Sequence, residues 1–279
     1  MQKITWQCRW SPTLGSLEGT HQDVWGTDEY TDDLRQTVFM GLYGLPDFFA
    51  LWRHKGEKHI LWCGSDITNL KNHYWLEDGG GIRIDRKGIC EWINAHCTSW
   101  CENEVEAKTL AECGIYARVQ PSFLGDIDDF PLSWKPGNKV YASVSGDNFE
   151  LYGWDKINVL ARNNPGLAFH LYGNIVVWTP EVNNITVHGR VTKERMNAEI
   201  IDMQCGLRMT EFDGMSEIIV KSVLMGQWPV SLIEYPHVLR PDQLSEILHK
   251  QDPNVEGREH YLKILNNFPW NNNYGKQED

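Results

Sequence analysis

The sequence lacks long hydrophobic runs. Its most apolar stretch, residues 218–233, is interrupted by Lys221, Gly226 and Pro229. A membrane-spanning helix needs about 20 predominantly apolar residues in succession, so this stretch is too short and too interrupted to cross a bilayer. The first residues, Met1–Trp6, lead into polar sequence without the apolar core of a signal peptide. These features predict a cytoplasmic protein.

Positive charge is also scarce. The 279 residues include 26 Lys and Arg against 38 Asp and Glu, which gives a formal net charge of −12 at pH 7. A division at residue 137 leaves 13 basic and 20 acidic residues before it and 13 and 18 after it, so neither half is basic. Binding to a nucleic acid duplex normally recruits several Lys and Arg to the phosphates. The charge therefore argues against a protein whose main task is to hold a polyanion.

The seven cysteines are odd in number and scattered, and no two of them have the close CxxC spacing typical of zinc sites. A zinc site built from His96, Cys97, Cys101 and Cys113 remains as the lesser alternative. The sequence favours reduced, buried thiols and no metal.

What the sequence does contain is an alternation of short apolar runs with longer periodic segments, the pattern of parallel sheets covered by helices. The segment 123–138 breaks this rhythm with two Pro, two Gly and an acidic run, and it is predicted to link two α/β domains, 1–130 and 131–279. Strands are predicted over 59–63, 95–100, 116–119, 139–144, 167–171, 185–188, 205–210 and 229–233. Helices are predicted over 46–53, 102–113, 152–163, 192–203, 215–225, 241–250 and 256–267.

The segment 208–217 is the most informative part of the chain, because a strand end leads through a Gly-containing turn directly into a helix. In such folds ligands bind beyond the carboxyl ends of the strands. Free N–H groups at the helix start, near Met215 and Ser216, would bind a phosphate. Asp213 would instead take hydroxyls or stabilise developing positive charge. The alternative is a surface turn in which Asp213 or Ser216 is a plain N-cap.

The second half resembles the C-terminal domain of retaining glycosyltransferases of the GT-B architecture. The family signature is an acidic residue and Gly, a second acidic residue eight positions after the first, and a Gly-x-Pro-Val turn. Asp213-Gly214 fits its first part, and residues 226–230 fit its last part with one extra residue. Further landmarks lie at 149–153, 169–173 and 185–191. The resemblance implies two Rossmann-like, doubly wound domains that face each other across a cleft.

The resemblance also implies the chemistry: transfer of a sugar from a nucleotide-sugar donor, with a UDP-sugar as first expectation, to an acceptor hydroxyl with retention and without a metal or other cofactor. Asp213 would lie beside the sugar. The second acidic position of the signature, which in the family holds the nucleotide ribose, is Lys221 here, so either Glu217 takes its role or the ribose is held differently. Lys221 would meet a phosphate or extend along the helix surface into water. The donor-binding residues implied are Arg190, Arg208, Glu211, Gly214, Met215, Ser216, Glu217 and Lys221, with Lys156 as a weaker candidate.

The first half resembles the family less closely. A glycine-rich loop that approaches the sugar and the acceptor is expected from Gly15, Ser16, Glu18 and Gly19. Asp66 and His21 are expected to position the acceptor hydroxyl. The alternatives are a loop-capping role for Asp66 and a surface position for His21.

The acceptor stays open between a glycan, a lipid-linked sugar and a small molecule. One alternative is a hydroxymethylated DNA base, the acceptor of some compact virus-encoded transferases, since the 13 Trp offer stacking partners for a flipped base. The other is a non-catalytic protein that binds nucleotides or carbohydrates, which the departure at Lys221 motivates. No protein partner is indicated.

Overall fold

The structure is a computed structural model that describes residues 5–17, 19–72, 85–144, 148–173 and 182–273. The chain divides into two compact units. Unit 1 comprises Met1–Gly125, Phe212–Met215 and Ile264–Asp279, and unit 2 comprises Asp126–Glu211 and Ser216–Lys263. Within the described ranges, no helix is both long enough and apolar enough to span a bilayer.

Unit 1 contains a six-stranded sheet in the order β2-β1-β3-β4-β5-β6, in which every neighbouring pair is parallel. The strand order reverses beside β1, so that β1 and β3 form the switch point of a doubly wound sheet. The strands are β1 (Gln7–Trp10), β2 (Asp28–Glu29), β3 (Thr37–Met40), β4 (Lys58–Leu61), β5 (Thr98–Cys101) and β6 (Ala117–Val119).

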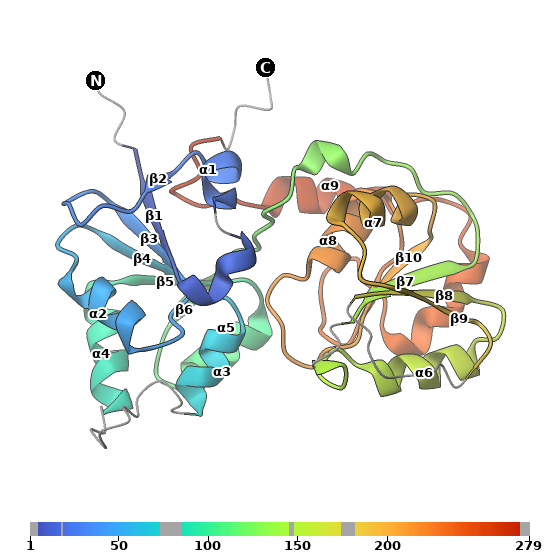
Figure 1. The fold of residues 1–279 in the computed structure, drawn as a ribbon, viewed down its shortest axis with the longest axis horizontal. Helices are drawn as coiled ribbons and strands as arrows, with labels where there is room; N and C mark the ends of the chain where they lie inside the picture. The colour runs from blue at the N-terminus through green and yellow to red at the C-terminus, as the bar shows by residue number, and fades with distance from the viewer. Residues whose placement is uncertain (1–4, 18, 73–84, 145–147, 174–181, 274–279) are drawn as a thin grey trace. The chain divides into compact units, whose positions relative to one another are not determined.

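Helices cover both faces of this sheet, because apolar side chains alternate along its strands (Figure 1). Phe39 and Ile60 point to the face covered by α2–α5, whereas Val38 and Leu61 point to the face covered by α1 and the segment 264–273. The period of two places successive residues on opposite faces. The helices are α1 (Thr20–Trp25), α2 (Leu45–Arg53), α3 (Ser65–Lys71), α4 (Arg86–His96) and α5 (Glu104–Glu112), and a 3₁₀ helix, η1 (Pro12–Leu17), follows β1.

An aromatic cluster closes the second face of unit 1. Trp270 has no exposed surface, stacks on Phe268 with ring centroids 4.4 Å apart, and meets the Trp100 ring edge-on at 5.5 Å. Trp6 and Trp25 also contact Trp270, each at 6.1 Å. Aromatic pairs of this kind add to the stabilisation that their buried area already gives. The end of the described chain is thereby built into the core of unit 1.

Unit 2 contains a five-stranded parallel sheet in the order β11-β10-β7-β8-β9. Read from β9, this order is 3-2-1-4-5 in terms of the chain, which is the order of the Rossmann fold, with its switch point between β7 and β10. The strands are β7 (Lys139–Ser143), β8 (Ala168–Tyr172), β9 (Ile185–Gly189), β10 (Cys205–Arg208) and β11 (Val230–Ser231).

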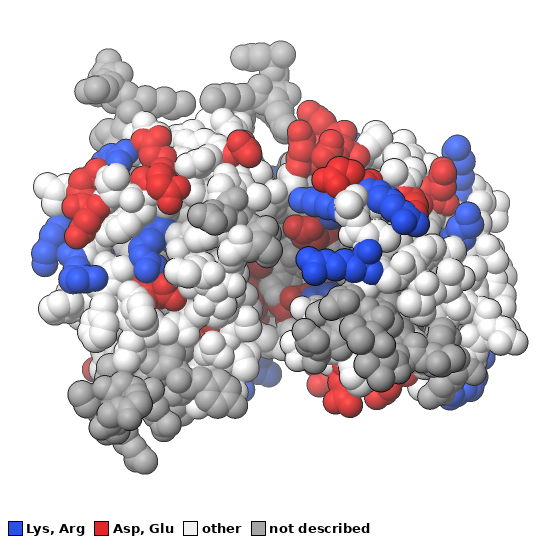
Figure 2. Space-filling model, in the orientation of Figure 1, with Lys and Arg blue, Asp and Glu red and all other residues white. Residues whose placement is uncertain are grey.

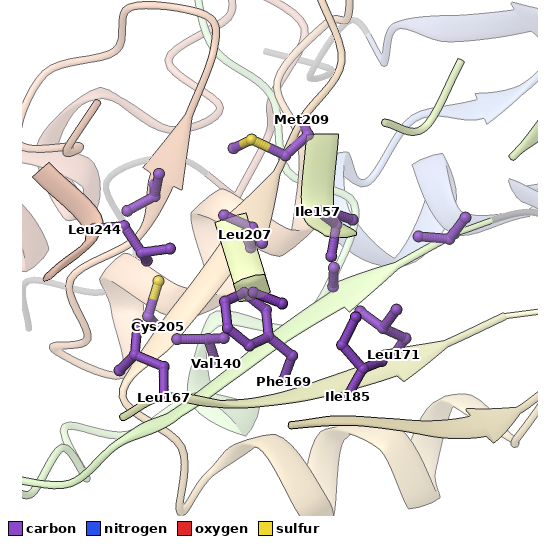
Figure 3. Packing of buried hydrophobic residues seen from close by; sticks show 14 of the residues in the cluster. Val140, Ile157, Leu167, Phe169, Leu171, Ile185, Cys205, Leu207, Met209 and Leu244 are labelled. Atoms are coloured by element: carbon purple, nitrogen blue, oxygen red, sulfur yellow. The ribbon is translucent and has the colours of Figure 1, made fainter. Parts of the chain in front are cut away.

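The core of unit 2 joins one face of the sheet to α6 (Trp154–Asn163) and to the 3₁₀ helix η4 (Pro241–His249) (Figure 3). Val140, Phe169 and Leu207 from neighbouring strands meet Ile157 of α6 there, all with at most 1% exposure. On the other face, α8 (Glu217–Leu224) packs on β10. A Cβ at Gly206 would lie 2.9 Å from the Ile218 carbonyl, so glycine permits this close approach. Unit 2 also contains α7 (Lys193–Ile200), α9 (Val255–Ile264) and the short 3₁₀ helix η2 (Ile127–Asp129).

The predicted architecture of two parallel, doubly wound α/β sheets is confirmed. Three local predictions are wrong. The strand predicted from residue 95 begins at Thr98, because α4, which the sequence reading missed, extends to His96. The segment predicted as an α-helix over 241–250 is the 3₁₀ helix η4. The predicted glycine-rich loop around Gly15 is η1, a 3₁₀ helix.

We predict that Trp270→Ala lowers the free energy of unfolding by about 3–5 kcal/mol, because it opens a cavity among rings that are themselves buried. Trp52→Ala is the control, since the Trp52 side chain is 54% exposed. Urea unfolding followed by circular dichroism measures both. Equal losses for the two variants would contradict the role assigned to the aromatic cluster.

Candidate active site

The carboxyl edge of the unit 2 sheet carries the first group of candidate residues. At the switch point, β7 leads toward α6 and β10 leads toward α8, so the N-termini of both helices follow strands that are neighbours in the sheet. Helix N-termini carry partial positive charge and unpaired N–H groups. This edge is therefore where unit 2 is suited to bind an anion.

Arg208 ends β10 at this switch point. Its guanidinium carbon lies 4.7 Å from the ring centroid of Tyr152, just before α6, a cation–π contact that orients the side chain. Gly153 has a φ of 77° and lies so close to Met209 that a Cβ would collide with it. Only glycine fits there, so the segments that follow β7 and β10 can pack closely.

The remaining cationic candidates differ in position. Arg190 is exposed and directly follows β9, whose final residue, Gly189, has a φ of 72°. Because β9 is three strands from β10, the two strand ends are separated by about 14 Å at the usual strand spacing. Lys156 pairs with Glu211 at 2.8 Å, and both side chains are substantially exposed. Arg208 is thus the cation placed at the switch point itself.

Glu217 and Lys221 form an ion pair on α8. The Lys221 Nζ lies 2.9 Å from Glu217 Oε2, and it lies 5.5 Å from the ring centroid of Phe130. Lys221 is only 4% exposed, so the predicted alternative of a lysine extended along the helix into water is wrong. Burial acts to raise the pKa of the Glu217 carboxyl, but the attraction of Lys221 outweighs it and the pKa is lowered. Lys221, which stands where the family signature has its second acidic residue, thus keeps Glu217 ionised.

Ser216 is the N-cap residue of α8. Its side chain is 6% exposed and, among the described residues, accepts no hydrogen bond from the amides of the first turn. Those amides are consequently not satisfied by their own cap. They are the N–H groups of unit 2 best suited to meet a phosphate.

The segment Phe212–Met215, which carries Asp213, packs within unit 1. The Asn103 side-chain amide donates hydrogen bonds to the backbone carbonyls of Asp213 (2.8 Å) and Gly214 (3.2 Å). The Met215 amide donates to Glu102 Oε2 at 2.7 Å. The prediction that the Met215 amide is free to bind a phosphate is therefore wrong, because a carboxylate of the protein already accepts from it.

Glu102 belongs to a group of buried and partly buried carboxyls that follow the carboxyl ends of β4 and β5. The Ser122 hydroxyl donates to Glu102 Oε1, and the Glu102 amide donates to Glu106 Oε2 at 2.8 Å. Burial raises the pKa of Glu102 to about 7, with a further contribution from the charges of Asp213 and Asp66. Burial and the Glu102 charge raise the pKa of Glu106 well above its ordinary value.

Asp66 lies in the first turn of α3 and has no exposed surface. Its carboxylate accepts from the amides of Leu42 (3.0 Å), Cys63 (3.0 Å) and Ile67 (2.9 Å). Burial raises its pKa to about 6, against the effect of these hydrogen bonds. These contacts tie together the loops after β3 and β4, so the geometry supports the alternative of a loop-capping carboxylate.

His21 is 2% exposed, so the predicted surface position is wrong. Its Nδ1 lies 2.8 Å from the Thr27 hydroxyl, and its ring lies 5.9 Å from the Trp10 ring. Burial lowers its pKa. Gly15 and Ser16 are part of η1 after β1, and Gly19, with a φ of 84°, precedes α1. Glu18 lies outside the described residues.

The sequence reading missed Glu102, Asn103 and Glu106 as site residues. Acidic residues are common at the start of a helix because they stabilise the helix dipole, so those of α5 did not stand out as site residues. Asn103 is indeed the N-cap of α5, since its side chain accepts from the Glu106 amide at 3.0 Å. The signal available was the position of these residues directly after a buried strand, where polar side chains meet a ligand or another loop.

The two sheets define the fold of GT-B glycosyltransferases, and comparison with solved structures supports this. The chain resembles a TarM mutant of S. aureus in a complex that contains UDP (TM-score 0.58, 14% identity, 84% of this chain and 53% of that chain). It also resembles sucrose-phosphate synthase from Thermosynechococcus elongatus (TM-score 0.55, 10% identity, 91% and 73%) and OtsA (TM-score 0.51, 10% identity, 79% and 64%). The chain thus spans about half the length of TarM. Neither a protein-family profile nor a curated protein sequence matches it.

Two Glu–Lys pairs of unit 2 provide a matched stability test. Glu217→Gln leaves the buried Lys221 ammonium without its carboxylate, and we predict a loss of about 1–3 kcal/mol in unfolding free energy. Glu211→Gln removes the partner of Lys156, whose side chain is 43% exposed, and no measurable loss is expected. Urea unfolding at pH 7.5 compares them, and equal effects would show that Lys221 is not buried as described.

The carboxyl pair of unit 1 predicts a pH dependence of stability. Since folding raises the pKa of Glu102 and Glu106, the folded state binds more protons, and its stability falls as pH rises from about 4.5 through about 7. Glu106→Gln removes one titrating group and is expected to lessen the loss of stability between pH 5 and pH 8. Glu104→Gln, at an exposed position of the same helix, should leave that loss unchanged. A Glu106→Gln variant that loses as much stability as the wild type would refute the burial of this charge.

Proposed function

We propose that the chain is a glycosyltransferase that moves a sugar from a nucleotide-sugar donor, with a UDP-sugar as the first candidate, to an acceptor hydroxyl with retention at the anomeric carbon. The observation that carries the proposal is the GT-B fold of both sheets, shared with TarM and sucrose-phosphate synthase. One of these similar structures holds UDP together with an α-GlcNAc-glycerol.

The donor nucleotide is assigned to the carboxyl edge of unit 2. Arg208, held against Tyr152, provides a planar set of donors for the diphosphate. The first amides of α8, which Ser216 does not cap, add N–H groups and the positive end of the helix dipole. Glu217, kept ionised by Lys221, is suited to accept hydrogen bonds from the ribose hydroxyls. Arg190 at the end of β9 is a secondary contact.

The chemical step is the departure of the nucleoside diphosphate from the anomeric carbon. The negative charge that develops on the leaving group is stabilised by Arg208 and the helix amides, in the place that a metal ion takes in other enzymes. The sugar acquires oxocarbenium character, and the Asp213 carboxylate is assigned to stabilise it. Asp213 follows Arg208 by five residues and precedes Glu217 by four, so the groups come from one continuous segment.

For the acceptor we propose a glycan or a small molecule with a free hydroxyl. The surface argues less for a DNA base, because Figure 2 shows acidic side chains beside several of the basic ones among the described residues on the face drawn. The net charge of −12 has the same implication.

A panel of nucleotide sugars tests the proposed function. UDP-glucose, UDP-N-acetylglucosamine, UDP-galactose, ADP-glucose and GDP-mannose are each added to the protein, and the melting temperature and the release of nucleoside diphosphate are recorded. We expect a UDP-sugar to raise the melting temperature and to be hydrolysed slowly without an acceptor. If nucleotide sugars bind but none is hydrolysed or transferred, with or without glycan acceptors, the result would favour a non-catalytic binding protein and contradict the proposal.

Two variants test the assigned residues. Arg208→Ala should weaken UDP binding about 10- to 100-fold, the effect of losing a charged hydrogen-bonding group, whereas Lys135→Ala, at an exposed position of the same unit, should not. Asp213→Asn should lower kcat about 100- to 1,000-fold with little change in UDP affinity. Calorimetry and diphosphate release measure these effects. Wild-type behaviour of both variants would refute the site assignment.

A further inference from the structure

The segment Asp213–Met215 is held within unit 1 by three hydrogen bonds from two neighbouring residues. Two come from the Asn103 side chain to consecutive carbonyls, and the third joins the Met215 amide to the Glu102 carboxylate. Together they engage the carbonyl oxygens of Asp213 and Gly214 and the amide of Met215, and so hold the backbone from Asp213 to Met215. A side chain attached to such a backbone loses most of its positional freedom.

Two glycines allow this arrangement. Gly214 has no room for a side chain, because a Cβ there would collide with Glu102 Oε2. Gly64, with a φ of 83°, faces the same segment, and its Cβ position lies 3.5 Å from the Gly214 amide nitrogen. The turn after β4 therefore meets the backbone of the segment after β10 at contact distance, and the side chain of Glu106 lies against both glycines and that of Glu102 against Gly214.

Glu106 lies against both glycines and against the backbone of Glu102. It has no exposed surface, and its Oε1 has no hydrogen-bond partner among the described residues. That oxygen points at the two glycines, lying 3.5 Å from the Cβ positions of both Gly64 and Gly214. A buried polar atom without a partner is costly, so its retention needs a reason. The other oxygen of Glu106 accepts from the Glu102 amide and thereby sets the backbone from which the Glu102 carboxylate reaches Met215.

We propose that Glu102 and Asn103 are positioning residues that fix the Asp213–Met215 segment, and with it the Asp213 carboxylate, in the geometry that sugar transfer requires. The inference rests on the proposed function of Asp213. Neither residue needs to touch the sugar. A catalytic carboxylate has to be held within about 0.5 Å of its productive position, and the two side chains supply the support that a four-residue segment cannot supply itself.

The sharpest variant is Asn103→Asp. Aspartate is as good an N-cap as asparagine, so α5 keeps its first hydrogen bond from the Glu106 amide. The donors to the carbonyls of Asp213 and Gly214 are replaced by a carboxylate that repels them. The substitution thus separates the helix-capping role of Asn103 from its positioning role. Glu104→Gln, an exposed change on the same helix, is the matched control.

A second pair of variants addresses Glu102. Glu102→Gln keeps an oxygen to accept from the Met215 amide and an amide group to donate to the Ser122 hydroxyl. Glu102→Ala removes both contacts. A role in positioning therefore predicts that Gln rescues what Ala loses.

Two measurements are made on the full chain. The first is hydrogen exchange of the peptide 211–218, in which the Met215 amide should exchange about tenfold faster in Glu102→Ala, which removes its acceptor, and in Asn103→Asp, which releases the two preceding carbonyls and so lets the segment open. The second is kinetics with the UDP-sugar that the wild type hydrolyses. There we expect kcat to fall about 100-fold in both variants with KM and UDP affinity within threefold of wild type. Glu102→Gln and Glu104→Gln should stay within threefold in both measurements.

Each outcome decides one claim. Wild-type exchange in Asn103→Asp overturns the positioning of the segment, whatever the enzyme does. Faster exchange with wild-type kcat shows that the segment is held but that its position does not serve the reaction, which overturns the proposal as stated. If the wild type turns over no nucleotide sugar, the proposed function fails through that result alone. The exchange measurement then still tells whether Glu102 and Asn103 hold the segment.

Discussion

In a parallel sheet all strands end at the same edge, and this constraint determines where each unit collects its polar groups. The strands themselves are apolar on both faces, so that Val140, Phe169 and Leu207 are almost fully buried. The polar candidate site residues lie at the last position of a strand or after it. In unit 2 these are Arg208 and Ser216, and in unit 1 they are Asp66, Glu102 and the segment Phe212–Met215. Each unit gathers its ionisable groups where backbone amides and helix N-termini are also available.

The two units use this edge in opposite electrostatic ways. Unit 2 combines a positioned guanidinium with helix amides that Ser216 does not cap, and the buried cation Lys221 is neutralised by Glu217. Unit 1 accumulates carboxyls, and burial raises the pKa values of Glu102 and Glu106. The first environment is suited to an anion such as a diphosphate, whereas burial in the second favours the protonated, neutral form of its carboxyls. The overall charge of −12 describes neither of them.

The sequence was sufficient for the sheet of unit 2, whose five strands were all predicted, because its signals are local; in unit 1 the strands β2 and β3 were not predicted. The short apolar run in 139–143, whose three central residues are buried, and the apolar periods of the helices follow directly from burial, and they predicted parallel sheets covered by helices. Lys221 was misread because its position on α8 indicates an exposed helix lysine, whereas Phe130, about 90 residues earlier, covers it. Glu102 and Asn103 were missed for the same reason, since their partners at 213–215 are more than 100 residues away. The pairing of Trp270 with Trp6 and Trp100 likewise joins residues far apart in the chain, and only the fold shows it.

The central claim is that the carboxyl edge of unit 2 binds the diphosphate of a nucleotide sugar. A crystal structure of the chain with UDP tests it most directly. The account predicts phosphate density within hydrogen-bonding distance of the Arg208 guanidinium and the first amides of α8, with the ribose hydroxyls toward Glu217. Well-defined UDP bound at any other place, with Arg208 still against Tyr152 and no contact to the phosphates, would contradict it.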